Sequence, residues 1–120
     1  MADIYTDAGE DITADIMDGT TSPPANWFVG WGTGAGTAAK ADTTLFTESA
    51  EARTASTESQ PASNQNRFVA TITATAPRTI TNAGVLSASS GGTLLLHSDF
   101  TGVVLATNDG ITFTFTLTWS

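Results

Sequence analysis

The last ten residues, ITFTFTLTWS at positions 111–120, alternate apolar side chains with threonine or serine. In a β-strand successive side chains point to opposite faces, so the apolar set needs a core while the hydroxyl set forms an uncharged row on the other face. Threonine suits an exposed strand because β-branching fits the pleat, which leaves both water and another subunit open as the cover of this row. The pattern predicts a half-buried strand.

The β pattern extends over most of the second half of the chain. RFVATITATA at 67–76 alternates in the same way, and RTITNAGVLSA and TLLLHSDF follow it. The turn sequences SSGG at 89–92 and NDG at 108–110 separate these segments. Strands spaced at about ten residues with polar turns predict an antiparallel β-sandwich or barrel.

The sequence DAGEDITADIMDG predicts a short helix near the N-terminus. Asp7 is placed to cap it, Glu10 stands three residues on to complete a capping box, and Gly19 follows as a stop. Ile12 and Ile16 share one face, which gives a narrow apolar stripe. A helix of this kind is not stable alone, so we expect it to pack on another part of the molecule.

A chain of 120 residues is expected to form one domain. Pro23 and Pro24 end the helical pattern. We expect an N-terminal arm with the short helix at 1–26 and a β domain at 27–120. The predicted fold class is therefore mainly β, an antiparallel sandwich or barrel with a short N-terminal helix.

Two stretches between the helix and residue 67 lack a clear periodicity. After the strand-like WFVGW, residues 32–44 form a loop rich in glycine and alanine, and residues 55–66 have no apolar period. The second stretch predicts a loop that is mobile or ordered by a partner. The glycines at every second position from Gly30 to Gly36 lack the spacing of a dinucleotide site and predict close backbone approach or an unusual loop conformation.

The charge balance limits the partners. The chain has 12 acidic and 4 basic residues and a net charge of -8, and half of the acids precede the first basic residue, Lys40. Four scattered cations neutralise few phosphates, so we expect no nucleic-acid partner. No apolar run approaches the roughly 18 residues of a membrane span, and the N-terminus is acidic where a secretion signal is basic. We expect a protein made in soluble form, with no membrane partner.

The residue types that carry catalysis are sparse. The absence of cysteine excludes disulfides and cysteine nucleophiles. On a strand, Ser98 points away from His97 and Asp99, so a catalytic triad is not expected and His97 is interpreted as a half-exposed strand histidine. Four loop acids are the candidates for paired carboxylates or calcium ligands: Asp42, Glu48, Glu51 and Glu58. Without a calcium-loop motif they define no ion site, and we expect no metal, no cofactor and no enzyme activity.

The three tryptophans have two interpretations. Trp27, Trp31 and Trp119 are able to stack on sugars, or they fill the core of a small β protein. The core is favoured, because large aromatic residues in a small β protein are more often buried.

Three segments together resemble a family of small tailed-bacteriophage virion proteins. They are NWFVGWGTGAGTAAKADTTLFTESAEART, VATITATAPRTITNAGVLSASSGGTLLLHSDF and LATNDGITFTFTLTWS. The chain is also distantly similar to the globular part of phage tail-collar fibre proteins. It departs from the family pattern at Asn82 and Ala83, where an acidic residue is common before the glycine, and at Val85 and Leu86, where Leu-Phe is usual. The resemblance implies a structural protein without cofactor or catalytic residues.

Among structural roles, the size of the chain favours a capsid decoration or cement protein, since it has no fibrous repeat and no heptads. On this hypothesis it is made in the host cytoplasm and binds the major capsid protein on the outer surface of the virion as a homotrimer. The predicted contact residues are Tyr5, Ile12, Ile16, Trp27, Phe28 and Trp31.

The sequence leaves two alternatives open. A tail fibre, collar or receptor-binding module would use exposed Trp27 or Trp31 to hold a host glycan. A small glycan hydrolase would need two loop carboxylates about 5 to 10 Å apart, and the unpatterned polar loop gives no reason to expect such a pair.

Overall fold

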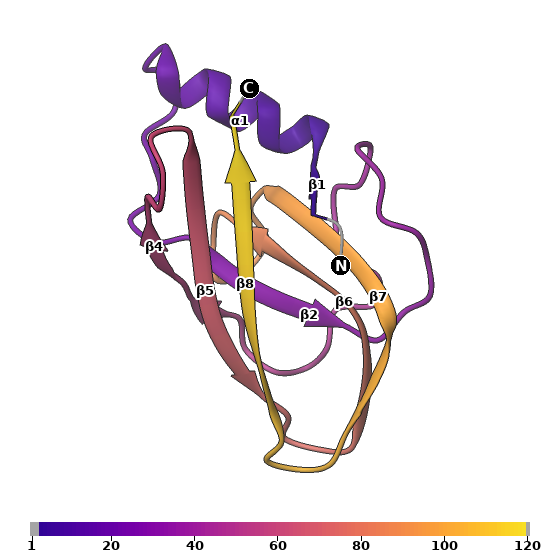
Figure 1. The fold of residues 1–120 in the computed structure, drawn as a ribbon. Helices are drawn as coiled ribbons and strands as arrows, with labels where there is room; N and C mark the ends of the chain where they lie inside the picture. Colours follow the sequence, from indigo (N-terminus) through magenta and orange to yellow (C-terminus); the bar gives the residue numbers. More distant parts are fainter. Residues whose placement is uncertain (1–2, 120) are drawn as a thin grey trace.

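A computed structural model describes residues 3–119, which form two antiparallel sheets and one helix (Figure 1). One sheet has the order β1-β7-β6-β2-β3 and the other the order β4-β5-β8. The fold is mainly β with a short N-terminal helix, which confirms the predicted class. The elements are β1 (Ile4–Tyr5), α1 (Asp7–Met17), β2 (Phe28–Gly32), β3 (Thr54–Ala55), β4 (Thr57–Ser59), β5 (Gln65–Thr73), β6 (Arg78–Leu86), β7 (Leu94–Leu105) and β8 (Gly110–Thr118).

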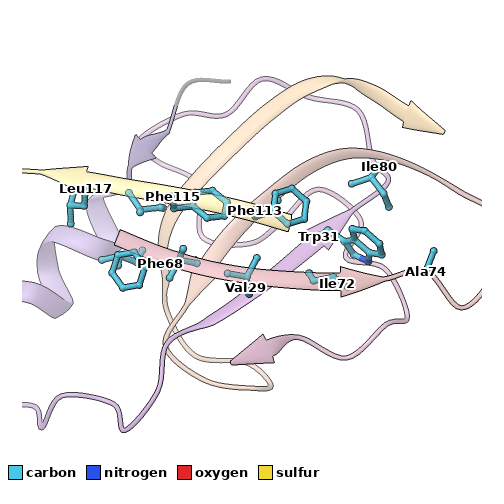
Figure 2. Packing of buried hydrophobic residues seen from close by; sticks show 14 of the residues in the cluster. Val29, Trp31, Phe68, Ile72, Ala74, Ile80, Phe113, Phe115 and Leu117 are labelled. Carbon is cyan, nitrogen blue, oxygen red and sulfur yellow. The ribbon is translucent and has the colours of Figure 1, made fainter. Parts of the chain in front are cut away.

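The core lies between the two sheets and follows the alternation seen in the sequence (Figure 2). On β8, Phe113, Phe115 and Leu117 are buried, whereas Thr112 and Thr114 are exposed. β5 contributes its own alternate residues to the same core. The period-2 prediction for these strands is therefore confirmed; Ser120, the last residue of the hydroxyl row, lies outside the described residues.

The hydroxyl row faces away from the core, on the outer face of the sheet β4-β5-β8. Thr71 on β5 lies opposite Thr112 on β8, and their Oγ1 atoms are 2.7 Å apart. A hydroxyl pair of this kind is a favourable cross-strand contact. This one pair therefore bonds across the strands, while Thr112 and Thr114 stay exposed on the outer face.

Helix α1 begins one residue earlier than predicted, with Thr6 as its N-cap in place of Asp7. The Thr6 hydroxyl accepts a bond from the backbone N–H of Gly9 at 2.9 Å and donates to the carbonyl of Leu94 on β7 at 2.6 Å. Thr6 is fully buried. An aspartate is costly to bury without a charged partner, so the cap that also anchors the helix to the sheet is the neutral hydroxyl.

The N-terminal segment packs across one end of the two sheets (Figure 1). β1 pairs with β7, with Tyr5 opposite Leu96, and Ile12 of α1 packs against the core. The predicted capping-box residue Glu10 instead binds the Nζ of Lys40, at 2.6 Å. Of the described residues, no helix is long and apolar enough to cross a membrane.

The alternating glycines hold the loop after β2 against residues 46–48. The N–H of Gly34 donates to the Phe46 carbonyl at 3.0 Å, and Gly32 forms a bridge with Glu48. A Cβ on Gly32 would lie 2.3 Å from the Phe46 oxygen. Close backbone approach, one of the two roles predicted for these glycines, is confirmed.

The polar stretch 55–66 is not the loop that its composition predicts. β3 and β4 lie at its start, paired with β2 and β5, and β5 begins at Gln65. The three side chains of β4 are all exposed. Because these short strands lie at sheet edges and bond through their backbones, they need no apolar period, and the prediction of a mobile or partner-ordered loop was wrong for them.

Candidate functional site

A groove of about 370 Å³ lies at the end of the molecule where α1 crosses the sheets. Residues from the helix, from the proline segment after it and from both sheets form its walls. They are Thr13, Ile16, Pro23, Pro24, Trp27, Glu58, Asn66, Phe68, Leu95, Leu117 and Trp119. We call this set the tryptophan groove.

Trp119 is held in place from several directions. Its indole Nε1 donates to Asn66 Oδ1 at 2.7 Å, and its backbone N–H donates to the Asn64 carbonyl at 2.7 Å. The ring of Tyr5 meets it edge-on at 5.7 Å, and the Tyr5 hydroxyl in turn bonds to Thr13 of α1. Trp119 keeps 39% of its surface exposed, so the structure presents a fixed and accessible indole.

Trp27 and Glu58 form another part of the wall. The backbone N–H of Ser56 donates to the Trp27 carbonyl at 2.8 Å, and the Ser56 hydroxyl lies 2.7 Å from Glu58 Oε2. The Trp27 ring packs edge-on against Phe68 at 6.1 Å. Ser56 thus positions a half-buried indole and a carboxylate together.

The groove combines aromatic surface with a few polar groups. Indole faces pack against the C–H faces of a ligand, while the Glu58 carboxylate accepts hydrogen bonds and the Asn66 amide also donates them. None of its described lining residues is basic. This chemistry suits an uncharged, hydroxyl-bearing ligand better than a phosphate or a carboxylate.

The structure gathers only two of the six predicted contact residues in this groove, Ile16 and Trp27. Tyr5 does not line the groove but packs against Trp119, which does. Ile12 packs against the core, and Phe28 is half-buried on β2. Trp31 is 1% exposed, which leaves it without surface for a partner. Its ring packs against Phe113, as the core interpretation of the tryptophans predicts.

Sequence reasoning named Glu58 only among the candidate loop acids and did not single out Asn66. It gave Trp119 two interpretations, sugar stacking or core, and favoured the core. The position of Trp119 in the sequence is the one available indication of its exposure. It follows Phe113, Phe115 and Leu117 in the alternating row, after the last residue of the strand, where the core ends. Glu58 and Asn66 precede and follow the turn between β4 and β5 and face the groove only because that hairpin forms. No local pattern marks them.

Glu51 is the centre of a buried polar cluster that is separate from the groove. Its Oε1 accepts from Trp31 Nε1 at 3.0 Å and from the Ser49 hydroxyl. Its Oε2 accepts from the N–H and hydroxyl of Thr75 and from Arg78 Nε at 3.0 Å. Burial alone would raise the pKa of Glu51, but these hydrogen bonds hold the pKa well below its usual range. The carboxylate is therefore a structural anion that joins β6 to the loop before β3.

His97 is fully buried, and the prediction of a half-exposed strand histidine was wrong. Its Nδ1 lies 2.8 Å from Asp42 Oδ2 and its Nε2 lies 3.1 Å from Asn82 Oδ1. Asn82 also bonds to both backbone groups of Phe46. The loop that contains Asp42 covers His97 and removes it from solvent. The sequence of β7 alone does not predict this cover. The Ser98 hydroxyl donates to Asp3, so His97 and Ser98 bond to different partners.

The four candidate acids do not converge on one site. Asp42 binds His97, Glu48 pairs with Arg53, Glu51 pairs with Arg78, and Glu58 lies in the groove. Among residues 3–119, no group of three or more His, Cys, Asp or Glu side chains is placed to hold a metal ion.

Comparison with known proteins gives one clear relationship. No curated protein matches the chain. The family model described as Podophage GP4 fiber I protein gp80 matches residues 7–118. This match covers α1, every strand except β1 and almost the whole tryptophan groove, and it supports the resemblance to phage virion proteins. The chain belongs to the family of the podophage GP4 fiber I protein gp80 and is a phage virion structural protein.

Proposed function

We propose that this chain is a component of a virion fibre and that its tryptophan groove binds a saccharide of the host surface. The word fiber in the family description favours this role over the capsid decoration that the size of the chain suggests. The observation that carries the proposal is the pair of accessible indoles, Trp27 and Trp119, in a groove that also holds a carboxylate and an amide.

The chemistry of the groove matches a neutral pyranose. Such a sugar has an apolar C–H face that stacks on an indole and a rim of hydroxyl groups that bond to carboxylate and amide oxygens. The volume of about 370 Å³ lies in the range of small-molecule sites. Because Asn66 and Tyr5 already hold Trp119, little side-chain freedom is lost on binding.

The groove supports binding without turnover. Hydrolysis of a glycosidic bond ordinarily uses two carboxyl groups that flank the bond, whereas the described lining of the groove contains one, Glu58. We propose that attachment depends on many weak contacts acting together on one particle.

Replacing Trp119 with alanine is expected to weaken saccharide binding by about 10-fold or more, because an aromatic anchor is lost. The measurement is binding of the purified chain to an array of neutral, amino and acidic saccharides, followed by titration of the best neutral one. Glu58→Gln keeps the shape of the groove and should also weaken binding. Val104→Ala, which changes a residue 80% exposed and outside the groove, is the matched control.

Two results would contradict the saccharide site. One is the absence of binding to every saccharide on the array by a folded wild-type chain. The other is unchanged affinity in both Trp119→Ala and Glu58→Gln.

The position on the particle is tested by immunogold electron microscopy of intact virions, with antibody raised against the recombinant chain. Gold on fibres is the expected result. Even labelling of the head would instead support capsid decoration, in which a homotrimer binds the major capsid protein. The uncharged threonine face, suited to packing between protein copies, is the observation in favour of that second candidate.

A further inference from the structure

The polar groups that the fold leaves free in the tryptophan groove limit which saccharide fits there. Apart from the two tryptophans, the polar side chains of the lining are Thr13, Glu58 and Asn66. The Thr13 hydroxyl is already used, because it donates to the Gly9 carbonyl at 2.8 Å and accepts from the Tyr5 hydroxyl at 2.8 Å. Recognition of a ligand by these three side chains therefore depends on Glu58 and Asn66.

Each of these two side chains uses one polar atom within the fold and keeps the other. Asn66 Oδ1 accepts from the indole Nε1 of Trp119 at 2.7 Å, and Glu58 Oε2 accepts from the Ser56 hydroxyl at 2.7 Å. The bond to Trp119 fixes the orientation of the Asn66 amide, since an oxygen has to face the indole N–H. Within residues 3–119, Asn66 Nδ2 and Glu58 Oε1 have no hydrogen-bond partner, so the groove offers one amide donor and one carboxylate acceptor.

The two free groups lie on the same side of the β4–β5 hairpin. Glu58 lies opposite Phe68, and Asn66 precedes Phe68 by two residues on β5, so their side chains share the face toward the core. Diagonal neighbours of this kind are about 7 to 8 Å apart across a sheet. This spacing suits a ligand group that has a donor on one side and an acceptor on the other.

The most buried part of the lining is apolar. It consists of Phe68, Leu95 and Leu117, each of which is at most 6% exposed. Figure 2 shows Phe68 and Leu117 at the end of the core that lies beside helix α1. A ring hydroxyl placed on this apolar floor would lose water without gaining a partner, which is costly, whereas a methyl group is stabilised there.

We propose that the groove selects an N-acetylhexosamine and recognises its acetamido group. The acetamido N–H donates to Glu58 Oε1, the acetamido carbonyl accepts from Asn66 Nδ2, and the methyl group packs on the apolar floor. The pyranose ring stacks on an accessible indole. No bond within the protein has to break, because Asn66 Oδ1 and Glu58 Oε2 keep their partners. This assignment rests on the proposed saccharide site and narrows its ligand to one substituent.

Other substituents on the sugar match the groove less well. A hydroxyl group in place of the acetamido group donates to Glu58 but brings no methyl group to the floor. An ammonium group pairs with Glu58 but has no acceptor for Asn66 Nδ2. A sugar carboxylate meets the carboxylate of Glu58, and the described lining contains no basic residue to offset this repulsion. Of these groups, the acetamido group alone uses the donor, the acceptor and the apolar floor together.

Titration of the purified chain with methyl glycosides tests this selection. The probes are the β-glycosides of N-acetylglucosamine and N-acetylgalactosamine, compared with those of glucose, galactose and glucosamine. The better N-acetylated glycoside should bind at least about 10-fold more tightly than its parent hexose, because the parent leaves a hydrogen-bonding group of the site unpaired. Binding is followed by NMR of the indole N–H groups: the signal of Trp119 should shift, while that of Trp31, which is buried against Glu51, should not.

The variant Asn66→Asp removes the amide donor and keeps the shape of the groove. A carboxylate oxygen still accepts from Trp119 Nε1, so the indole stays in place. The N-acetylated and parent glycosides should then bind with similar affinity. The matched control is Gln65→Glu, which adds the same charge one residue earlier, on the opposite face of β5, and should keep the preference.

The outcomes separate this inference from the site on which it rests. Equal affinity of the unmodified chain for N-acetylated and parent glycosides would leave a saccharide site but overturn its selectivity. Tighter binding of the glucosamine glycoside, or an unchanged preference in Asn66→Asp, would overturn the recognition of the acetamido group. A folded chain that binds none of the glycosides would overturn both proposals.

A peptide analogue distinguishes the sugar from the other common source of secondary amides. N-acetylglycine methylamide has the same amide and methyl groups but no pyranose ring to stack on an indole. It should bind at least about 10-fold more weakly than the better N-acetylated glycoside, because the aromatic contact is missing. Equal or tighter binding of this analogue would assign the groove to a peptide and overturn the proposal.

Discussion

Replacing Glu51 with alanine is expected to lower the free energy of unfolding by about 3 to 5 kcal/mol, because it removes one partner of a buried ion pair. The Glu51 side chain is 3% exposed and accepts bonds from Trp31, Ser49, Thr75 and Arg78. Without the carboxylate, the indole N–H and the guanidinium lose their acceptor inside the protein. Since small domains are stable by about 5 to 15 kcal/mol, the variant should unfold at a much lower urea concentration, measured by tryptophan fluorescence.

The control for this prediction is Glu48→Ala, which removes the carboxylate that pairs with Arg53. The Glu48 side chain is 35% exposed, so water replaces part of the lost interaction and the loss of stability should be smaller. Equal urea midpoints for Glu51→Ala and the wild-type chain would show that the buried cluster contributes nothing net.

Acid titration gives an independent test of the same carboxylate. The hydrogen bonds to Glu51 lower its pKa in the folded protein below the ordinary value of 4.5. The unfolded chain therefore takes up this proton at a higher pH than the folded chain. The stabilisation is complete above pH 4.5 and is lost as the pH falls below that value. The unfolding free energy of the wild-type chain should fall more steeply in acid than that of Glu51→Gln; parallel profiles would contradict this.

Regular alternation made the main part of the fold predictable from the sequence. On β5 and β8 the period-2 pattern follows directly from a sheet with one face on the core, and the structure buries the expected residues. β3 and β4 were not predictable because backbone pairing at a sheet edge leaves no apolar signal. His97 was misjudged for a similar reason, since its cover comes from Asp42 in a distant loop.

The tryptophan groove was less predictable than the fold because it brings together residues from Thr13 to Trp119. Composition identified the tryptophans as sugar-stacking or core residues but could not divide them between these roles. The division depends on position: Trp31 lies within β2 and is buried between the sheets, whereas Trp119 lies just past the end of β8 and is 39% exposed. Such a difference is visible only after the strands are paired.

Gly32→Ala is expected to destabilise the protein by about 3 kcal/mol or more, the upper end of the range for an added methyl group in a packed site. The new Cβ would lie 2.3 Å from the Phe46 carbonyl oxygen and 2.9 Å from Asn82 Nδ2. Phe46 cannot simply retreat, because the Asn82 amide bonds to both its N–H and its C=O at 3.0 Å. Asn82 is in turn held by buried His97. Relief of the clash therefore requires the loss of several buried hydrogen bonds.

Gly30→Ala provides the matched comparison, two residues earlier on the same strand. A Cβ at Gly30 would lie 3.1 to 3.3 Å from side-chain atoms of Leu45, Arg53 and Glu48, which are able to shift by a few tenths of an ångström. We expect its cost to stay below about 1 kcal/mol. Thermal unfolding followed by circular dichroism compares the two variants directly. A similar melting temperature for both would mean that the contact between Gly32 and Phe46 yields easily, and that a glycine at position 32 is not required for the approach of this loop.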